Sequence, residues 1–166
     1  YLNKNIHTSI HTCKSLNLNA LNDKVIQRGI DNVKINTGLF GRWSLIEDNP
    51  IIIFDSAHNE SGFKSLANQI SKMTYNKIYI LLSFVKGKKI KDLIRHLPED
   101  SNIYFTSLKI ERSMDLEEIN LNFTESIKFD VNSKRIFNKI KTEASKDDLI
   151  LITGSNYIAK EIFNEN

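Results

Sequence analysis

Short apolar segments alternate with amphipathic ones from residue 43 onward, and this alternation limits the possible folds more than any other feature. The apolar segments are predicted strands, at residues 43–47, 51–54, 77–82, 102–106, 126–129 and 149–152. Between them, apolar residues recur at steps of three and four, which is typical of helices. These helices run through Phe63, Leu66, Ala67, Ile70 and Met73, then Ile90, Leu93, Ile94 and Leu97, then Ile136, Ile140 and Ala144, and then Ile158, Ala159 and Ile162, with a shorter one at Met114–Ile119.

The character of the strands indicates how they pair. Strands that are apolar throughout are buried on both faces, and strands that alternate with helices are joined by right-handed crossovers into a parallel sheet. The first two strands are an exception, because the turn at 48–50 is short enough for antiparallel pairing. The sequence therefore predicts an α/β fold, a three-layer open and mostly parallel sheet with helices on both faces.

The first 41 residues have a different pattern. A helix is predicted where apolar side chains share one face, at Ile6, Ile10, Cys13 and Leu16. A second short helix is predicted over 23–29. The polar segment 31–42 contains two glycines close together and is expected to be a turn or linker. We therefore divide the chain into two short helices plus linker, 1–41, and an α/β domain, 42–166.

Composition and charge bear on location and partners. The 166 residues carry 23 basic and 20 acidic side chains and a net charge of +3, without a basic stripe, so no nucleic-acid partner is expected. No apolar run approaches the roughly 20 residues that span a bilayer. The chain begins with Tyr1 and lacks a secretory signal pattern. We expect a cytoplasmic monomer that is a piece of a longer chain.

Ligands of open parallel sheets bind beyond the carboxyl ends of the strands, and one such segment is rich in polar groups. Asp55-Ser56-Ala57-His58-Asn59 follows the strand 51–54 and precedes a helix. The Asp55 carboxylate can accept hydrogen bonds from ribose hydroxyls or help to hold a cation, and His58 can donate a hydrogen bond or carry charge. The plainer alternative is that Asp55 caps a turn and His58 lines a surface loop.

Three further segments could contact an anion. Arg42, in Gly41-Arg42-Trp43, has a planar guanidinium suited to phosphate. Ser155, in Thr153-Gly154-Ser155-Asn156-Tyr157, could cap the last helix with its N–H groups facing an anion. Lys88 belongs to a lysine-rich loop over 86–91. For each, a solvated side chain or ordinary helix capping is the simpler interpretation.

Several site types are not supported by the sequence. No Gly-x-x-x-x-Gly-Lys-Ser/Thr loop and no Gly-x-Ser-x-Gly turn occurs in the chain. Cys13 and the four histidines do not form a zinc pattern, and a single cysteine allows no internal disulfide. No metal site is predicted within this chain.

Taken in order, Gly41-Arg42-Trp43, Asp55-Ser56-Ala57-His58-Asn59 and Gly154-Ser155-x-Tyr157 resemble the carboxyl-terminal part of folylpolyglutamate synthase/dihydrofolate synthase, in the Mur ligase superfamily. The resemblance spans nearly the whole chain. It implies a Rossmann-like Mur ligase C-terminal domain in 42–166, and in 1–41 the closing helices of the central ATPase domain. It further implies an ATP-dependent carbon–nitrogen ligase that phosphorylates the carboxylate of dihydropteroate or folate, which the amine of glutamate then attacks.

The resemblance assigns roles to the nucleotide side of the site. ATP is expected between the central and carboxyl-terminal domains. Asn5 matches an asparagine that contacts the nucleotide, Arg42 the linker arginine that reaches the phosphates, and Asp55 an aspartate that contacts the nucleotide. The P-loop, the Mg²⁺ ligands and the folate pocket are expected in an amino-terminal part that this chain lacks. We therefore expect the chain to be inactive by itself and to need the central domain of the same polypeptide as its partner.

Other positions match the glutamate side and the chemistry. His58 matches a histidine important for activity and, with Arg42, is predicted to be catalytic. Ser155 and Tyr157 match positions near the glutamate site, and His58 and Lys88 are predicted to bind on the same side. Lys88 is the one charged residue kept in a loop where the family commonly carries two aspartates.

Departures from the family keep alternatives open. Glu60 stands where the family often has proline, and Phe40 replaces the proline before Gly-Arg. The altered lysine loop at 86–91 allows an inactive paralogue, or a non-catalytic module that binds phosphate or RNA. Another Mur-type amino-acid ligase is also possible, although the cell-wall branch usually has Asp-Asn-Pro-Arg in place of Asp55–His58.

Overall fold

The computed structural model describes residues 3–121 and 127–163. It divides the chain into two compact units, Tyr1–Phe40 and Gly41–Asn166. We describe each unit by itself.

The first unit consists of short helices. They are α1 (Asn3–Ser15), α2 (Asp23–Asp31) and α3 (Val33–Thr37). The expectation of a turn or linker over 31–42 is wrong for residues 33–37, because the chain makes one more helical turn before Gly38 ends it in the left-handed conformation (φ 64°). A helix of only five residues leaves almost no periodicity to detect in a sequence.

The second unit is built on one sheet. Its described strands are β1 (Ser44–Asp48), β2 (Ile51–Phe54), β3 (Ile78–Leu82), β4 (Asn102–Thr106), β5 (Lys128–Asp130) and β6 (Leu149–Thr153). They lie in the order β1-β2-β6-β3-β4-β5, with β1 antiparallel to β2 and every other neighbouring pair parallel. The predicted mostly parallel sheet is confirmed. Residue 126, the expected start of the fifth strand, lies outside the described residues.

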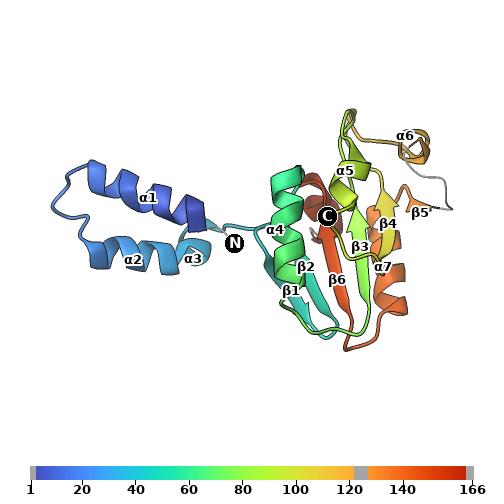
Figure 1. Cartoon of the computed structure of the whole chain (residues 1–166), viewed down its shortest axis with the longest axis horizontal. Coiled ribbons are helices and arrows are strands. Elements are labelled where there is room, and N and C mark those ends of the chain that lie inside the picture. The colour runs from blue at the N-terminus through green and yellow to red at the C-terminus, as the bar shows by residue number, and fades with distance from the viewer. Residues whose placement is uncertain (1–2, 122–126, 164–166) are drawn as a thin grey trace. The chain divides into compact units, whose positions relative to one another are not determined.

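Helices cover both faces of this sheet (Figure 1). They are α4 (Glu60–Ile70), α5 (Ile90–Ile94), α6 (Leu116–Asn120), α7 (Ser133–Glu143) and α8 (Tyr157–Phe163). Apolar side chains of α4, α5 and α6 share one buried cluster with one face of the strands, whereas those of α7 and α8 share a second cluster with the other face. The three-layer α/β architecture is thereby confirmed.

Burial of the central strands explains why their sequences are mainly apolar. Every residue of β3 and β6 is buried. In β2 the side chains alternate between the two clusters, with Ile53 in one and Ile52 and Phe54 in the other. Because β2, β6 and β3 are adjacent and parallel, the segments that follow them emerge at the same edge of the sheet. None of the described helices is both long enough and apolar enough to span a membrane.

Candidate functional site

The loops that follow β2, β6 and β3 contact one another directly. The carbonyl oxygen of Ala57 accepts hydrogen bonds from the Gly154 N–H (3.0 Å) and the Thr153 hydroxyl (3.3 Å). The Ser83 N–H donates to the carbonyl oxygen of Thr153 (3.2 Å). The motif that begins at Asp55 and the motif that includes Gly154 are therefore brought together at the carboxyl edge of the sheet.

Gly154 is the closest point of this contact. Its φ is +98°, and a Cβ at this position would lie 2.4 Å from the backbone oxygen of Ser83. Side chains rarely adopt this φ, and a backbone oxygen cannot rotate away as a flexible side chain could. Glycine is required here so that the exits of β6 and β3 can pack together.

Asp55 connects the β2 loop to the segment that precedes β1. Its side chain is fully buried, with 0% exposure. One carboxylate oxygen accepts a hydrogen bond from the Trp43 N–H (2.7 Å) and the other accepts one from the Ala57 N–H (2.9 Å). With one oxygen bonded to each segment, Asp55 ties the backbone of Trp43 to the loop after β2.

Arg42 is fastened to the same loop through its neighbour. The carbonyl oxygen of Gly41 accepts hydrogen bonds from the Ser56 N–H (2.9 Å), the Ser56 hydroxyl (3.0 Å) and Nη1 of Arg42 (3.1 Å). Nη1 of Arg42 also donates to the Ser56 hydroxyl oxygen. Arg42 and Asp55 therefore converge on one loop, and they do not lie on opposite surfaces of the unit.

The conformation of this joint explains its residue types. Gly41 has φ +76°, and a Cβ there would lie 2.8 Å from the ring of Phe54. Trp43 also has a positive φ, 50°, which is uncommon for a bulky residue. Its side chain packs against the cluster under α4, and its N–H is the donor that Asp55 holds. Burial of the indole and the bond to Asp55 together stabilise this unfavourable backbone.

His58, like Asn59, is an exposed member of the motif. Its Nδ1 lies 2.9 Å from the carbonyl oxygen of Ser56. A carbonyl oxygen can only accept, so Nδ1 carries a proton in this contact. In the neutral ring Nε2 is then the unprotonated nitrogen, which can accept a proton from a reacting group. The next residue, Asn59, caps α4 by accepting from the Gly62 N–H (2.9 Å).

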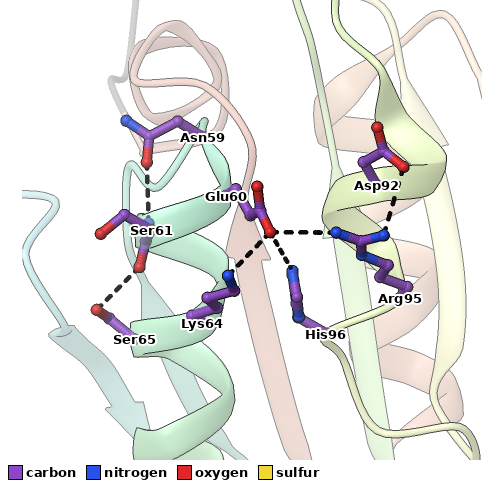
Figure 2. Close-up of polar contacts among 9 residues, drawn as sticks. Asn59, Glu60, Ser61, Lys64, Ser65, Asp92, Arg95 and His96 are labelled. Carbon is purple, nitrogen blue, oxygen red and sulfur yellow. Dashed lines mark hydrogen bonds and ion pairs between the residues drawn. The ribbon is translucent and has the colours of Figure 1, made fainter.

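Glu60, the first residue of α4, is the centre of an ion-pair cluster (Figure 2). Its Oε1 lies 2.9 Å from Nζ of Lys64, 3.1 Å from Nη2 of Arg95 and 3.5 Å from Nε2 of His96. The hydrogen bond and charge of Lys64, followed by Arg95, lower the pKa of Glu60 to about 2. The cluster joins the start of α4, two residues after His58, to the segment that follows α5.

Ser155 and Tyr157 lie beside this edge, at the start of α8. The buried Ser155 accepts a hydrogen bond from the Tyr157 N–H (3.3 Å). The Tyr157 side chain is 45% exposed, and its hydroxyl accepts from Nη2 of Arg112 (2.9 Å). Sequence reasoning did not single out Arg112, because no motif surrounds it and only the fold brings it to Tyr157.

Lys88 belongs to a loop that is held next to Arg112. The Lys86 N–H donates to the carbonyl oxygen of Arg112 (2.9 Å), and the Met114 N–H donates to that of Phe84 (2.9 Å). Lys88 itself is half-buried and lies in the same loop, just before α5. The structure thus brings the loop of Lys88 and, through Arg112, Tyr157 into one neighbourhood.

Asn5 belongs to the other unit. It is exposed on α1, and its carbonyl oxygen accepts from the Ser9 hydroxyl (2.9 Å). Its contact with a nucleotide stays a prediction, as do the functional roles of the other predicted site residues.

Among residues 3–121 and 127–163, no three His, Cys, Asp or Glu side chains gather as a metal site would require.

Comparisons with known proteins agree with this fold. Residues 41–156 match the family described as "Mur ligase, glutamate ligase domain". A dihydrofolate synthase/folylpolyglutamate synthase of Buchnera aphidicola subsp. Baizongia pistaciae is 32% identical over 142 residues, which cover 81% of this chain and 32% of that protein. The protein of the same name from Bacillus subtilis is 25% identical over 151 residues, covering 88% of this chain and 34% of the relative. The chain thus spans about a third of the length of these relatives.

Solved structures show the same architecture. The bifunctional folylpolyglutamate synthase/dihydrofolate synthase of Yersinia pestis, complexed with AMPPNP and a Mn ion, superposes with a TM-score of 0.70 at 20% identity, covering 82% of this chain and 32% of that one. The folylpolyglutamate synthase of Mycobacterium tuberculosis complexed with ADP gives a TM-score of 0.64 at 20% identity, covering 73% and 31%. At such identities the likeness establishes the fold, and the match over 41–156 establishes the family. This chain belongs to the Mur ligase family and carries its glutamate ligase domain.

Proposed function

We propose that the chain is the carboxyl-terminal part of an ATP-dependent ligase that joins glutamate to dihydropteroate or folate through an acyl phosphate. The observation that carries the proposal is the convergence of Arg42 and Asp55 on one loop at the carboxyl edge of the sheet. The names of the curated relatives support the folate branch over other Mur-type ligases.

Arg42 has the properties that a phosphate ligand needs. Arg42 is half-buried, and its Nη1 is held by Gly41 and Ser56. A guanidinium has five N–H donors in a planar fork, so donors remain for a phosphate. In the proposed reaction Arg42 neutralises charge that develops on the transferred phosphoryl group.

Asp55 contributes first of all by positioning. Each of its carboxylate oxygens accepts a hydrogen bond from a backbone N–H group, and one of these groups belongs to Trp43, the residue after Arg42. A carboxylate can accept more than one hydrogen bond per oxygen, but this side chain is fully buried, so a direct contact with the nucleotide would require the loop to open. Mg²⁺, when bound, would neutralise phosphate charge, and we expect its ligands in the amino-terminal part.

His58 is suited to the second half of the reaction. Its Nε2 is unprotonated in the neutral ring and its side chain is exposed next to the loop of Arg42. A base there can accept a proton from the amine of glutamate as the carbon–nitrogen bond forms. We assign the glutamate side of the site to His58, Ser155, Tyr157 and Lys88, which belong to the segments that follow β2, β6 and β3.

The first unit is proposed to complete a larger domain. Ile26 is the one large apolar side chain that it buries within its described residues, at 8% exposure. Several others stay exposed, namely Leu16, Leu18, Val25, Val33, Ile35, Leu39 and Phe40. A unit that buries so little of its own surface needs further chain to pack against. We infer that this further chain is the central ATPase domain, in which Asn5 would contact the nucleotide.

The test is an ATP-consumption assay of the full-length protein. With dihydropteroate or folate as acceptor, addition of glutamate is expected to give ADP, phosphate and the new amide in equal amounts, whereas residues 1–166 alone give none. Replacing glutamate by the amino acids of cell-wall ligases serves as the matched control. A full-length protein that consumes no ATP with either acceptor would remove the proposal.

A further inference from the structure

The Arg112–Tyr157 pair has the chemistry of a carboxylate-binding site. We propose that these two side chains together bind one carboxylate of the glutamate substrate, and that Arg112 thereby determines the specificity for an acidic amino acid. The proposal rests on the function inferred above. It adds to that function a residue that no motif includes.

The fold fixes the backbone of Arg112 at the edge of the sheet where the site lies. Val85 and Ser113 form an antiparallel bridge, and the Lys86 N–H donates to the carbonyl oxygen of Arg112 (2.9 Å). The segment around Arg112 is therefore paired with the chain that leaves β3. Tyr157 follows β6, the neighbour of β3 in the sheet, so two residues 45 positions apart meet there.

The geometry of the pair leaves donors available. Nη2 of Arg112 lies 2.9 Å from the Tyr157 hydroxyl, and the guanidinium carbon lies 5.5 Å from the ring centroid. The phenol oxygen accepts from Arg112, so its own proton is left to donate, as are the other guanidinium N–H groups. A guanidinium and a phenol side by side can each donate to one oxygen of a carboxylate.

Two other arginines of the second unit are already paired with carboxylates. Asp130 binds Arg135 through both oxygens, at 2.5 and 2.7 Å. Arg95 contacts Glu60 and Asp92. Arg112 differs, because among the described residues no carboxylate lies within ion-pair distance of it.

Two carboxylates of the segments that meet here are engaged by other groups. Glu161, one helical turn after Tyr157, accepts from the Lys109 N–H (2.6 Å) and the Ser133 hydroxyl (2.6 Å). Glu118 accepts from the Gly87 N–H (3.3 Å). Since no described carboxylate pairs with Arg112, its charge is left for an external anion. Its hydrogen bond to Tyr157, which we assigned to the glutamate side of the site, favours the carboxylate of the amino acid.

The experiment compares steady-state kinetics of the full-length protein with those of Arg112→Met, Arg112→Lys and Tyr157→Phe. Losing a charged hydrogen-bond donor from a binding site is expected to raise KM for glutamate about ten- to a hundredfold. KM for ATP and for the folate acceptor should stay unchanged, and Arg112→Lys should recover part of the loss. Arg135→Met is the matched control, because that arginine is paired with Asp130 away from the site.

Specificity gives a readout that a structural defect would not move. Wild-type protein should prefer glutamate over glutamine or over glutamate 1-amide, and Arg112→Met should lose the preference against one of these amides. The inference is overturned if Arg112→Met keeps both preferences and its KM for glutamate, or if KM for ATP rises equally. A wild-type protein without glutamate-dependent ATP turnover would instead overturn the proposed function itself.

Discussion

Replacing Gly154 by alanine tests the packing on which the site depends. Gly154 follows β6 with φ +98°, and an added Cβ would lie 2.4 Å from the backbone oxygen of Ser83 and 3.1 Å from the Phe84 ring. Contact with the ring can be relieved by a small rotation. Contact with the backbone oxygen can be relieved only if the ends of β6 and β3 move apart.

Two costs add at this position. A side chain held at such a φ costs about 1–3 kcal/mol. Forcing an extra methyl group into a packed contact costs about another 1–3 kcal/mol. We therefore expect Gly154→Ala to lower the free energy of unfolding by about 2–6 kcal/mol.

Gly87→Ala is the matched control. Gly87 has φ +79°, and nothing lies within 4 Å of the Cβ that would be added. Gly87→Ala should show only the cost of a side chain at positive φ. The difference in free energy of unfolding between the two variants, about 1–3 kcal/mol, then measures the contact with Ser83.

Urea unfolding followed by tryptophan fluorescence is the assay. Trp43 is the chain's single tryptophan and belongs to the second unit, so the signal reports on the unit that contains both glycines. With a slope of about 1–3 kcal/mol per molar urea, the unfolding midpoint of Gly154→Ala should lie about 0.7 M or more below that of wild type. Equal midpoints for Gly154→Ala and Gly87→Ala would refute the reasoning, because the contact with Ser83 would then cost nothing.

Three further variants test neighbouring features. Asp55→Asn keeps one acceptor oxygen for two backbone N–H groups and should lower the free energy of unfolding by about 2–4 kcal/mol; a wild-type urea midpoint would contradict this. Asn59→Ala removes the cap of α4 and should lower the free energy of unfolding by about 1 kcal/mol. An unchanged free energy of unfolding would mean that the Gly62 N–H finds another acceptor. Glu60, whose pKa falls from 4.5 to about 2 chiefly through Lys64, stabilises the fold above pH 4.5 and loses this effect as the pH falls toward 2. The melting temperatures of wild type and Glu60→Gln should therefore differ at pH 6 and converge toward pH 2, whereas a gap independent of pH would show that the charge is not responsible.

The sheet could be predicted because its information is local. Burial on both faces favours strands that are mainly apolar, and β3 and β6 are wholly buried as their mainly apolar sequences indicate. The neighbourhood of Asp55 and Gly154 could be expected as well, because carboxyl ends of parallel strands share an edge. The order of the strands, which makes β6 the neighbour of β2, has no local sequence signal.

Other features depend on pairings that a single sequence does not reveal. Arg112 reaches Tyr157 only because the loop after β3 pairs with residues 112–114. The ion pair between Glu60 and Arg95 forms only because the segment after α5 lies beside the start of α4. In the sequence alone, Glu60 is therefore no more than a glutamate at a position where the family often has proline. Asp55 appears in the sequence as a ligand or a turn cap, and only the structure shows its bond to the Trp43 N–H.

The most direct test of the central claim is the rate of glutamate-dependent ADP formation by the full-length protein and its Arg42→Met variant. If Arg42 stabilises the transferred phosphoryl group, kcat should fall by about 10²- to 10³-fold while the melting temperature stays close to that of wild type. A kcat within threefold of wild type would contradict the account, because the guanidinium at this edge of the sheet would then have no part in the chemistry.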